Sequence, residues 1–154
     1  MEGFKDLQRK NRLNKVGEGL IGNFGVLVLL DFAFVSELET LDLRNNDLTD
    51  EAVIALSQSE KLEGLVSLNL SNNNITDAGA LALAKTKKLK RLKKLNLNFN
   101  RIGDEGAKAI ARSPRLANLE SLKLGQNKIG TEGARALNES ENLQNLVHPI
   151  FGFY

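Results

Sequence analysis

Cysteine and tryptophan are absent from this 154-residue chain, and it has one histidine and two prolines. Without cysteine there is no disulfide framework and no thiolate metal site, and the usual clue to the redox compartment is lost. His148 would have to serve any Ser/His/Asp site or histidine metal site, and no partner constellation accompanies it. We therefore interpret His148, which precedes Pro149, as a capping residue, and we expect no metal and no cofactor.

An excess of either charge is also missing. Lys and Arg number 21 against 19 Asp and Glu, so the net charge of +2 gives no whole-chain signal for nucleic-acid binding. The chain is 42% hydrophobic and 26% charged, which is ordinary for a globular protein, and its length suits one domain with one continuous core.

No apolar run is long enough to predict a membrane span. Residues 20–35 (LIGNFGVLVLLDFAFV) are too short, and Asp31 interrupts them. The basic segment before this stretch makes a signal peptide conceivable, but its acidic residues Glu2, Asp6 and Glu18 argue against one. A cytoplasmic location is favoured, and secretion stays open as an alternative.

Leucine at a fixed spacing dominates the rest of the chain. Leucines recur every 27 residues and divide residues 38–145 into four units with the same pattern. Positions four and six of each unit are leucine, position nine is asparagine, and position eleven is leucine or isoleucine. The position-nine asparagines are Asn46, Asn73, Asn100 and Asn127.

This pattern, L-x-x-L-x-L-x-x-N-x-L, resembles the leucine-rich repeat. The following D-E-G-A-x-A-[IL] segment resembles the ribonuclease-inhibitor-like subfamily, particularly its bacterial members, although the uniform period of 27 departs from that subfamily's alternating periods. The resemblance covers residues 38–146, about seventy per cent of the chain. It implies an α/β solenoid that is curved, with short parallel strands on the concave face and helices on the convex face.

Within one unit, side chains alternate along the strand, so positions three, five and seven are expected to face outward on the concave side. Solenoids commonly bind partners there. The residues predicted to contact a partner are Arg44, Asn69, Lys94, Asn96, Asn98, Phe99 and Lys123. The position-nine asparagines are expected to form a buried ladder, in which loss of one amide would cost about 1–3 kcal/mol.

Each unit then predicts a helix. Position thirteen is Asp50, Asp77, Asp104 or Thr131, which we interpret as the N-cap of the helix that it begins. Apolar residues recur with helical spacing afterwards, and small residues at positions fifteen, sixteen and eighteen would allow close packing on the strand layer.

Both ends of such a stack need covering. Residues 1–37 are predicted to be an N-terminal cap with a degenerate repeat, because the 27-residue register puts Asn11 and Asn14 where leucines belong. Residues 146–154 are predicted to be a C-terminal cap, and the protein is expected to be a monomer. The side chains expected to cover the last repeat are Ile150, Phe151, Phe153 and Tyr154.

Two motifs suggest chemistry and have simpler structural interpretations. Residues 103–108 (GDEGAK) look like a phosphate-binding loop, but the lysine is not retained in the other units, and Asp104 and Glu105 would repel phosphate. Adjacent carboxylates such as Asp50 and Glu51 suggest acid–base catalysis, yet helix capping explains them. We therefore expect no enzyme activity.

A basic run holds seven cations in residues 85–95. Because leucines of the core interrupt it, the cations are expected to decorate a helix end and the turn that follows. Alternatively, the run contacts RNA, an acidic protein or a membrane surface, although it lacks the aromatic residues that stack on bases. Besides Lys94, the run contains Lys85, Lys87, Lys88, Lys90, Arg91 and Lys93.

Three functions are therefore considered. The leading prediction is a non-enzymatic module that binds another protein on its concave face. One alternative is binding of an anionic surface or RNA through Lys85–Lys94. The other is regulation of an enzyme such as a small GTPase, which rests on analogy of fold alone.

Overall fold

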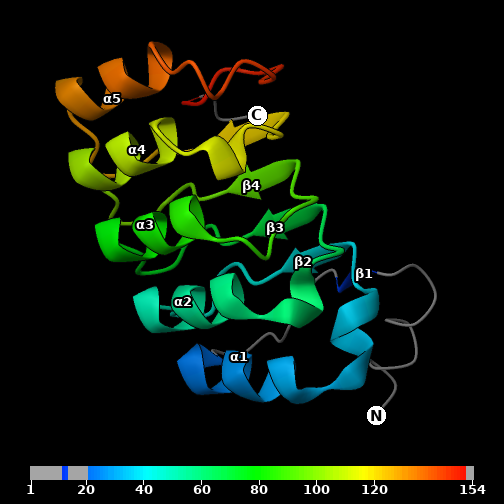
Figure 1. Ribbon diagram of the computed structural model, residues 1–154. Helices are drawn as coiled ribbons and strands as arrows, with labels where there is room; N and C mark the ends of the chain where they lie inside the picture. Colours follow the sequence, from blue (N-terminus) through cyan, green and yellow to red (C-terminus); the bar gives the residue numbers. More distant parts are fainter. Residues whose placement is uncertain (1–11, 14–20, 152–154) are drawn as a thin grey trace.

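Short strands and helices alternate along the chain in the computed structural model, which describes residues 12–13 and 21–151 (Figure 1). The strands are β1 (Arg12–Leu13), β2 (Thr40–Asp42), β3 (Ser67–Asn69), β4 (Lys94–Asn96) and β5 (Ser121–Lys123). The helices are α1 (Gly22–Asp31), α2 (Asp50–Gln58), α3 (Asp77–Lys85), α4 (Asp104–Ala111) and α5 (Thr131–Asn138). Single 3₁₀ turns are η2 (Ala33–Glu37), η3 (Glu60–Leu62) and η4 (Pro114–Leu116).

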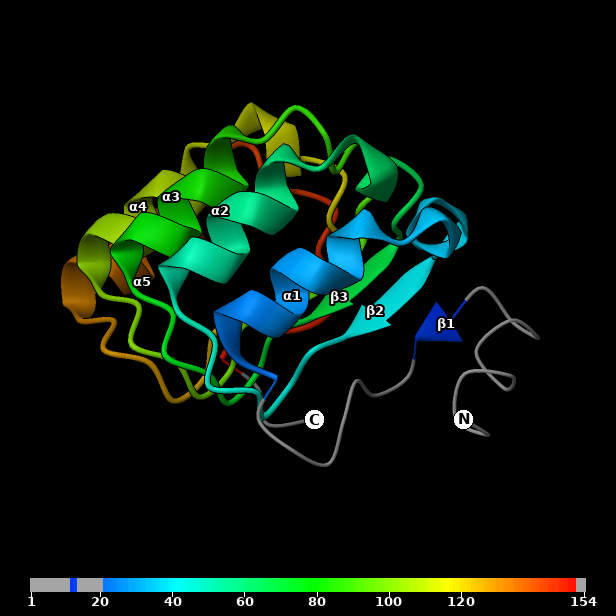
Figure 2. The same ribbon diagram turned by 90° about the horizontal axis from the view of Figure 1, so that it is seen from below.

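The strands form one parallel sheet in chain order, β1-β2-β3-β4-β5. Thr40 pairs with Ser67, Ser67 with Lys94, and Lys94 with Ser121, so each step in the sheet is one 27-residue unit. The helices stack on one side of this sheet (Figure 2), and each helix contacts the next along the chain. The predicted α/β solenoid is therefore confirmed.

The N-terminal unit departs from the 27-residue register. Arg12 pairs with Thr40 and Leu13 with Leu41, an offset of 28 residues. Leu13 thus takes the strand position that we assigned to Asn14, and that assignment was wrong by one residue. The predicted cap over residues 1–37 lies partly outside the described residues.

The core lies between the sheet and the helices. Alternation along each strand turns one leucine inward, and Leu41, Leu68, Leu95 and Leu122 are all buried. Helix residues such as Val53, Leu83 and Ile110 meet them from the other side. One continuous core therefore runs through every unit. Among the described residues, no helix is both long and apolar enough to cross a lipid bilayer.

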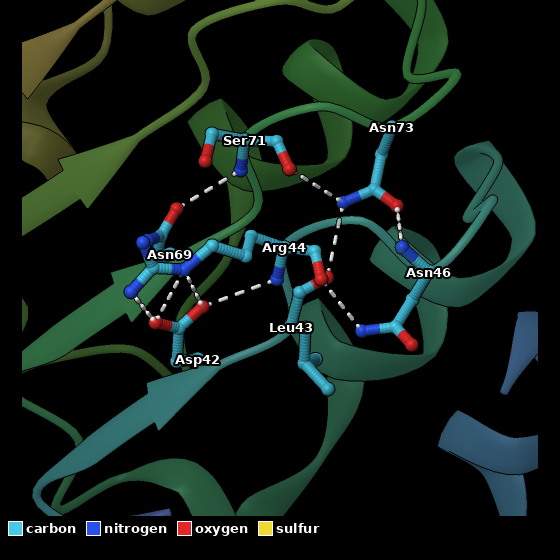
Figure 3. A network of polar contacts seen from close by, with 7 residues as sticks. All are labelled: Asp42, Leu43, Arg44, Asn46, Asn69, Ser71 and Asn73. Atoms are coloured by element: carbon cyan, nitrogen blue, oxygen red, sulfur yellow. Dashed lines mark hydrogen bonds and ion pairs between the residues drawn. The ribbon is translucent and has the colours of Figure 1, made fainter. Parts of the chain in front are cut away.

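The position-nine asparagines join neighbouring units where the chain leaves each strand. Asn73 Nδ2 donates to the backbone oxygens of Leu43 and Leu70, while its Oδ1 accepts from the N–H groups of Asn46 and Leu48 (Figure 3). Asn100 makes the corresponding bonds one unit further on. Three of the four side chains are buried, and Asn127 is half-buried. These amides satisfy backbone groups that the strands leave unpaired.

We predicted that the position-thirteen carboxylates cap their own helices, and this was wrong. The N-caps are Thr49, Thr76, Gly103 and Gly130, one residue earlier. Each aspartate instead accepts from the N-terminus of the next helix, as Asp104 Oδ1 does from Gly130 N at 2.7 Å and Gly133 N at 3.0 Å. A carboxylate there also complements the positive end of that helix dipole. The prediction missed this role because the accepting helix lies in a different unit.

Hydroxyl groups form a third column at the ends of the helices. Thr86, Ser113 and Ser140 follow α3, α4 and α5. Their side chains donate to backbone oxygens at the end of the helix one unit earlier, namely those of Ser57, Ala84 and Ala111. The helix C-terminus therefore receives a donor from the following unit, as its unpaired carbonyls require.

The C-terminal segment continues the edge of the sheet. Leu124 N donates to Ile150 O, and Val147 N donates to Glu120 O. Ile150 is buried and packs with the core, while Phe151 is partly exposed. Phe153 and Tyr154, which were also expected to cover the last repeat, lie outside the described residues.

Candidate functional site

A hollow of about 610 Å³ lies on the face of the sheet opposite the helices, which we call the strand face. Its floor comes from β3, β4 and β5, and one wall comes from the segment Val147–Pro149. Four of the predicted contact residues line it, namely Asn69, Lys94, Asn96 and Lys123. The hollow is therefore built where strand alternation turns positions three and five outward.

Two asparagine amides and two lysines from the strands line the floor of the hollow. Asn69 Oδ1 accepts from Ser71 N at 3.0 Å (Figure 3). One strand further on, Asn96 Oδ1 accepts from Asn98 N at 3.0 Å. These bonds orient the two amides, and their Nδ2 groups, which donate to no other described residue, are available to a ligand. With the ammonium group of the exposed Lys94 beside them, the hollow offers donors to carbonyl or carboxylate oxygens.

The structure does not bring Arg44 into the hollow. Its guanidinium is paired with Asp42 through Nε and Nη2, and Asp42 also accepts from Arg44 N (Figure 3). This pairing raises the pKa of Arg44, chiefly through the side-chain hydrogen bond with Asp42. Arg44 thus enters any contact as part of an ion pair on β2.

The expectation that Asn98 faces a partner was wrong. Its side chain is buried, and Oδ1 accepts from Gly125 N at 2.7 Å. Asn98 therefore links two neighbouring turns. Its sequence position did not reveal this, because the glycine that lets the amide approach belongs to the next unit.

Phe99 lies outside the hollow and has an unfavourable backbone conformation. It has φ +55°, the left-handed region that bulky side chains rarely adopt. Asn45 and Asn72 fill the equivalent turn positions in earlier units, and asparagine tolerates this conformation. Phe99 is nevertheless 51% exposed, so burial of its ring does not compensate for the strain.

Sequence reasoning missed the wall of the hollow. His148, interpreted as a cap, lines it together with Val147, Pro149 and Glu120. Ser67 and Ser121 complete the floor between the predicted residues. The wall follows the last complete unit and carries no repeated motif, so no signal in the sequence connected it with the strands.

Glutamates of neighbouring units neutralise three of the seven basic side chains that we assigned to the run. Lys88 pairs with Glu60 at 2.8 Å, Lys90 with Glu63 at 3.2 Å, and Lys93 with Glu120 at 2.7 Å. The hydrogen bond between Lys88 and Glu60 lowers the pKa of Glu60 and raises that of Lys88. Within the described part of the chain, Lys85, Lys87 and Arg91 make no ion pair.

The segment Gly103–Lys108 is a helix start. Gly103 N, a group that a phosphate would need, donates to Asp77 Oδ1 at 2.6 Å. Lys108 pairs with Glu105 one turn earlier in α4. A carboxylate thus already occupies this helix N-terminus, which removes the anion site that the sequence suggested. Asp50, a candidate for acid–base chemistry, and Asp104 also accept from backbone N–H groups of the next helix.

Comparison with known proteins gives matches to repeat families. A two-copy model described as "Leucine Rich repeats" matches residues 36–82 and 63–110, and a "Leucine Rich repeat" model matches residues 115–137. No curated protein matches the chain.

The solved structures that the chain is similar to include the crystal structure of an internalin (inlF) from Listeria monocytogenes, with 22% sequence identity and a TM-score of 0.33. The alignment covers 75% of this chain and 43% of the internalin chain. This chain therefore corresponds to less than half of that protein, and a likeness of this degree carries no argument about function.

Proposed function

The chain belongs to the leucine-rich-repeat family, and from that premise we propose that it is a non-enzymatic module that binds another protein on its strand face. The stacked units hold the strand face rigid, because neighbouring units are joined by hydrogen bonds at the strand exits and at both ends of the helices. A partner would therefore dock without paying much to order the receptor surface.

One observation carries this proposal, namely the donor-rich hollow over β3–β5. The amide donors of Asn69 and Asn96 lie on adjacent strands in register, beside Lys94 of the same strand as Asn96. Such a row suits a partner segment that presents backbone carbonyls or acidic side chains. Phe99, exposed and strained at the following turn, is the aromatic anchor that we assign to the same interface.

The test is a capture experiment from the native source with matched variants. The triple variant Asn69→Ala/Lys94→Ala/Asn96→Ala is expected to lose a protein that the wild type captures. Lys108→Ala, on the helix face, removes one lysine without touching the hollow and is expected to retain it. Capture that survives the triple change contradicts the strand-face assignment, provided that thermal melts show both variants folded.

Binding of an anionic surface or RNA stays a second candidate because Lys85, Lys87 and Arg91 have no ion pair in the described structure. This candidate predicts a steep loss of binding between low and moderate salt. Replacing these three residues by glutamine should abolish binding to a labelled RNA oligonucleotide or to phosphatidylserine vesicles. Binding that is insensitive to salt and to the substitutions rejects it.

The ribonuclease-inhibitor-like subfamily is a finer assignment that we also propose, on the D-E-G-A segments of the repeats. No feature of the described residues favours regulation of a small GTPase over other protein contacts, so that hypothesis stays a prediction from analogy of fold.

A further inference from the structure

The residue at position seventeen of the unit changes from apolar to charged along the row of helices. In α1, α2 and α3 it holds Leu27, Ile54 and Leu81, which are 39–40% exposed. In α4 and α5 the same column holds Lys108 and Arg135, each in an ion pair with a glutamate one turn earlier. Because the same fold accepts charge at this position twice, the three apolar residues are not required for stacking.

A fourth exposed apolar residue lies one turn before this row. Phe24 is 76% exposed on α1, in the column where α4 and α5 carry Glu105 and Glu132. Position seventeen is thus apolar over α1–α3 and charged over α4–α5, whereas in the column of Phe24 the change comes earlier, because α2 carries the exposed Glu51 there. Exposed apolar side chains in one contiguous patch are typical of interaction sites, whereas scattered ones are not.

The patch contains a groove between α2 and α3. Its walls are formed mainly by apolar groups of Ile54, Ala78, Leu81 and Ala82, and Lys85, Lys87 and Lys88 stand at its C-terminal end. Lys88 is neutralised by Glu60, whereas Lys85 and Lys87 have no ion pair among the residues that the structure describes. The groove therefore adds apolar surface between Ile54 and Leu81, where a ligand that crosses α2 and α3 would lie, and two uncompensated cations stand beside that crossing.

We propose that the helix face of α1–α3 is a second binding site, which takes an amphipathic helix with an apolar stripe and acidic residues on one flank. Packed helices lie about 8–10 Å apart, so the Leu27, Ile54 and Leu81 positions recur at about that spacing. An α-helix rises about 1.5 Å per residue, so apolar residues seven positions apart are separated by about 10 Å. A helix laid across the row can therefore meet all three side chains, and its acidic flank can face Lys85 and Lys87.

Charge distribution favours a helix over an anionic membrane. A helix is only about 10 Å wide and can follow the row. On the neighbouring helices a broad anionic surface would meet the pairs Lys108–Glu105 and Arg135–Glu132, whose charges cancel and add no attraction. The same surface would meet Glu51 at the start of α2, which is exposed. The like charge of Glu51 opposes such docking.

The probe is a stapled helical peptide with leucine at every seventh position and glutamate along one flank, carrying a fluorophore. Anisotropy should report saturable binding to the wild-type protein, and the counterpart with lysine in place of glutamate should bind at least ten-fold more weakly. Ile54→Lys/Leu81→Arg imports the residues that α4 and α5 already carry, so the fold should persist while affinity falls at least ten-fold. Lys85→Gln/Lys87→Gln should weaken binding several-fold and reduce its salt dependence.

Two controls fix the location. Lys108→Gln/Arg135→Gln alters the charged part of position seventeen and should bind as the wild type does, and so should the strand-face variant Asn69→Ala/Lys94→Ala/Asn96→Ala. Because the chain has no cysteine, a dye on Gln58→Cys, which lines the groove, labels that site alone and should change its emission on docking. Equal binding by Ile54→Lys/Leu81→Arg overturns the proposal. So does binding to phosphatidylserine vesicles without binding to the peptide, which would assign the patch to a membrane.

Discussion

At the scale of single residues, Phe99 has a positive φ that is unfavourable for phenylalanine. Asparagine adopts φ near +55° more easily than phenylalanine, as Asn72 does in the equivalent turn. We therefore expect Phe99→Asn to raise the free energy of unfolding by about 1 kcal/mol and to weaken partner capture. Urea denaturation and the capture assay measure the two effects. A loss of stability would show instead that the ring supports the fold.

The asparagine ladder makes a second prediction at this scale. Asn100 Nδ2 donates to the backbone oxygens of Leu70 and Leu97, and its Oδ1 accepts from Ile75 N. Asn100→Ala leaves Ile75 N without its acceptor, while the two oxygens keep the amide donors of Asn73 and Asn127. The change should lower the free energy of unfolding by about 1–3 kcal/mol. Asn96→Ala, which removes one local bond to Asn98 N, is the matched control and should cost less. Equal costs in urea denaturation would contradict a special role for the ladder.

At the scale of elements, a carboxylate couples each helix to the next. A Cβ on Gly133 would lie 2.6 Å from Asp104 Oδ1, which is held by two hydrogen bonds. Gly133→Ala should therefore destabilise the protein, although alanine is the better helix former by about 1 kcal/mol. In a double-mutant cycle, Asp104→Ala removes the closest contact of the added methyl group and leaves the one with Ile129 Cγ2 at 2.9 Å, so the double variant should lose less than the sum of the single changes. Strict additivity would show that the contact is not the cause.

The natural sequence contains a comparison for this contact. In α2 the equivalent of Gly133 is Ala52. In the preceding unit, the position of the aspartate is taken by Asn23 of α1. Asn23 Oδ1 accepts from Thr49 N, the N-cap position. A glycine in α3, α4 and α5 thus accompanies a carboxylate in the unit before it, and both change together in the first pair.

At the scale of the whole molecule, the sequence predicted what is periodic. Leucines 27 residues apart determined the strand register. When the same alternating pattern recurs in each strand, one register alone places all the leucines on the core side. The role of Asp104 could not be predicted in this way, because its acceptor bonds join residues 26 and 29 positions apart. The wall of the hollow at Val147–Pro149 follows the last unit and has no periodic signal. The burial of Asn98 depends on Gly125 in the neighbouring turn.

The three polar columns act on different edges of the stack. Asparagines join the strand exits, aspartates the helix starts, and Ser or Thr hydroxyls the helix ends. Each unit is therefore held to the next at three points around the leucine core. In a quasi-one-dimensional fold such contacts determine how far a local loss of structure spreads.

The end of the stack gives the last prediction. Ile150 is buried at the C-terminal edge, and its backbone oxygen accepts from Leu124 N, whereas Leu70 N in the interior donates to Asn96 O of a neighbouring strand. Ile150→Ala should cost about 2–3 kcal/mol. Hydrogen exchange should accelerate more at Leu124 N than at Leu70 N, because units at an end can open while the interior stays folded. The exposed Val147 provides the control, since Val147→Ala removes little buried surface. Equal acceleration at both amides would mean that the whole stack opens as one cooperative unit.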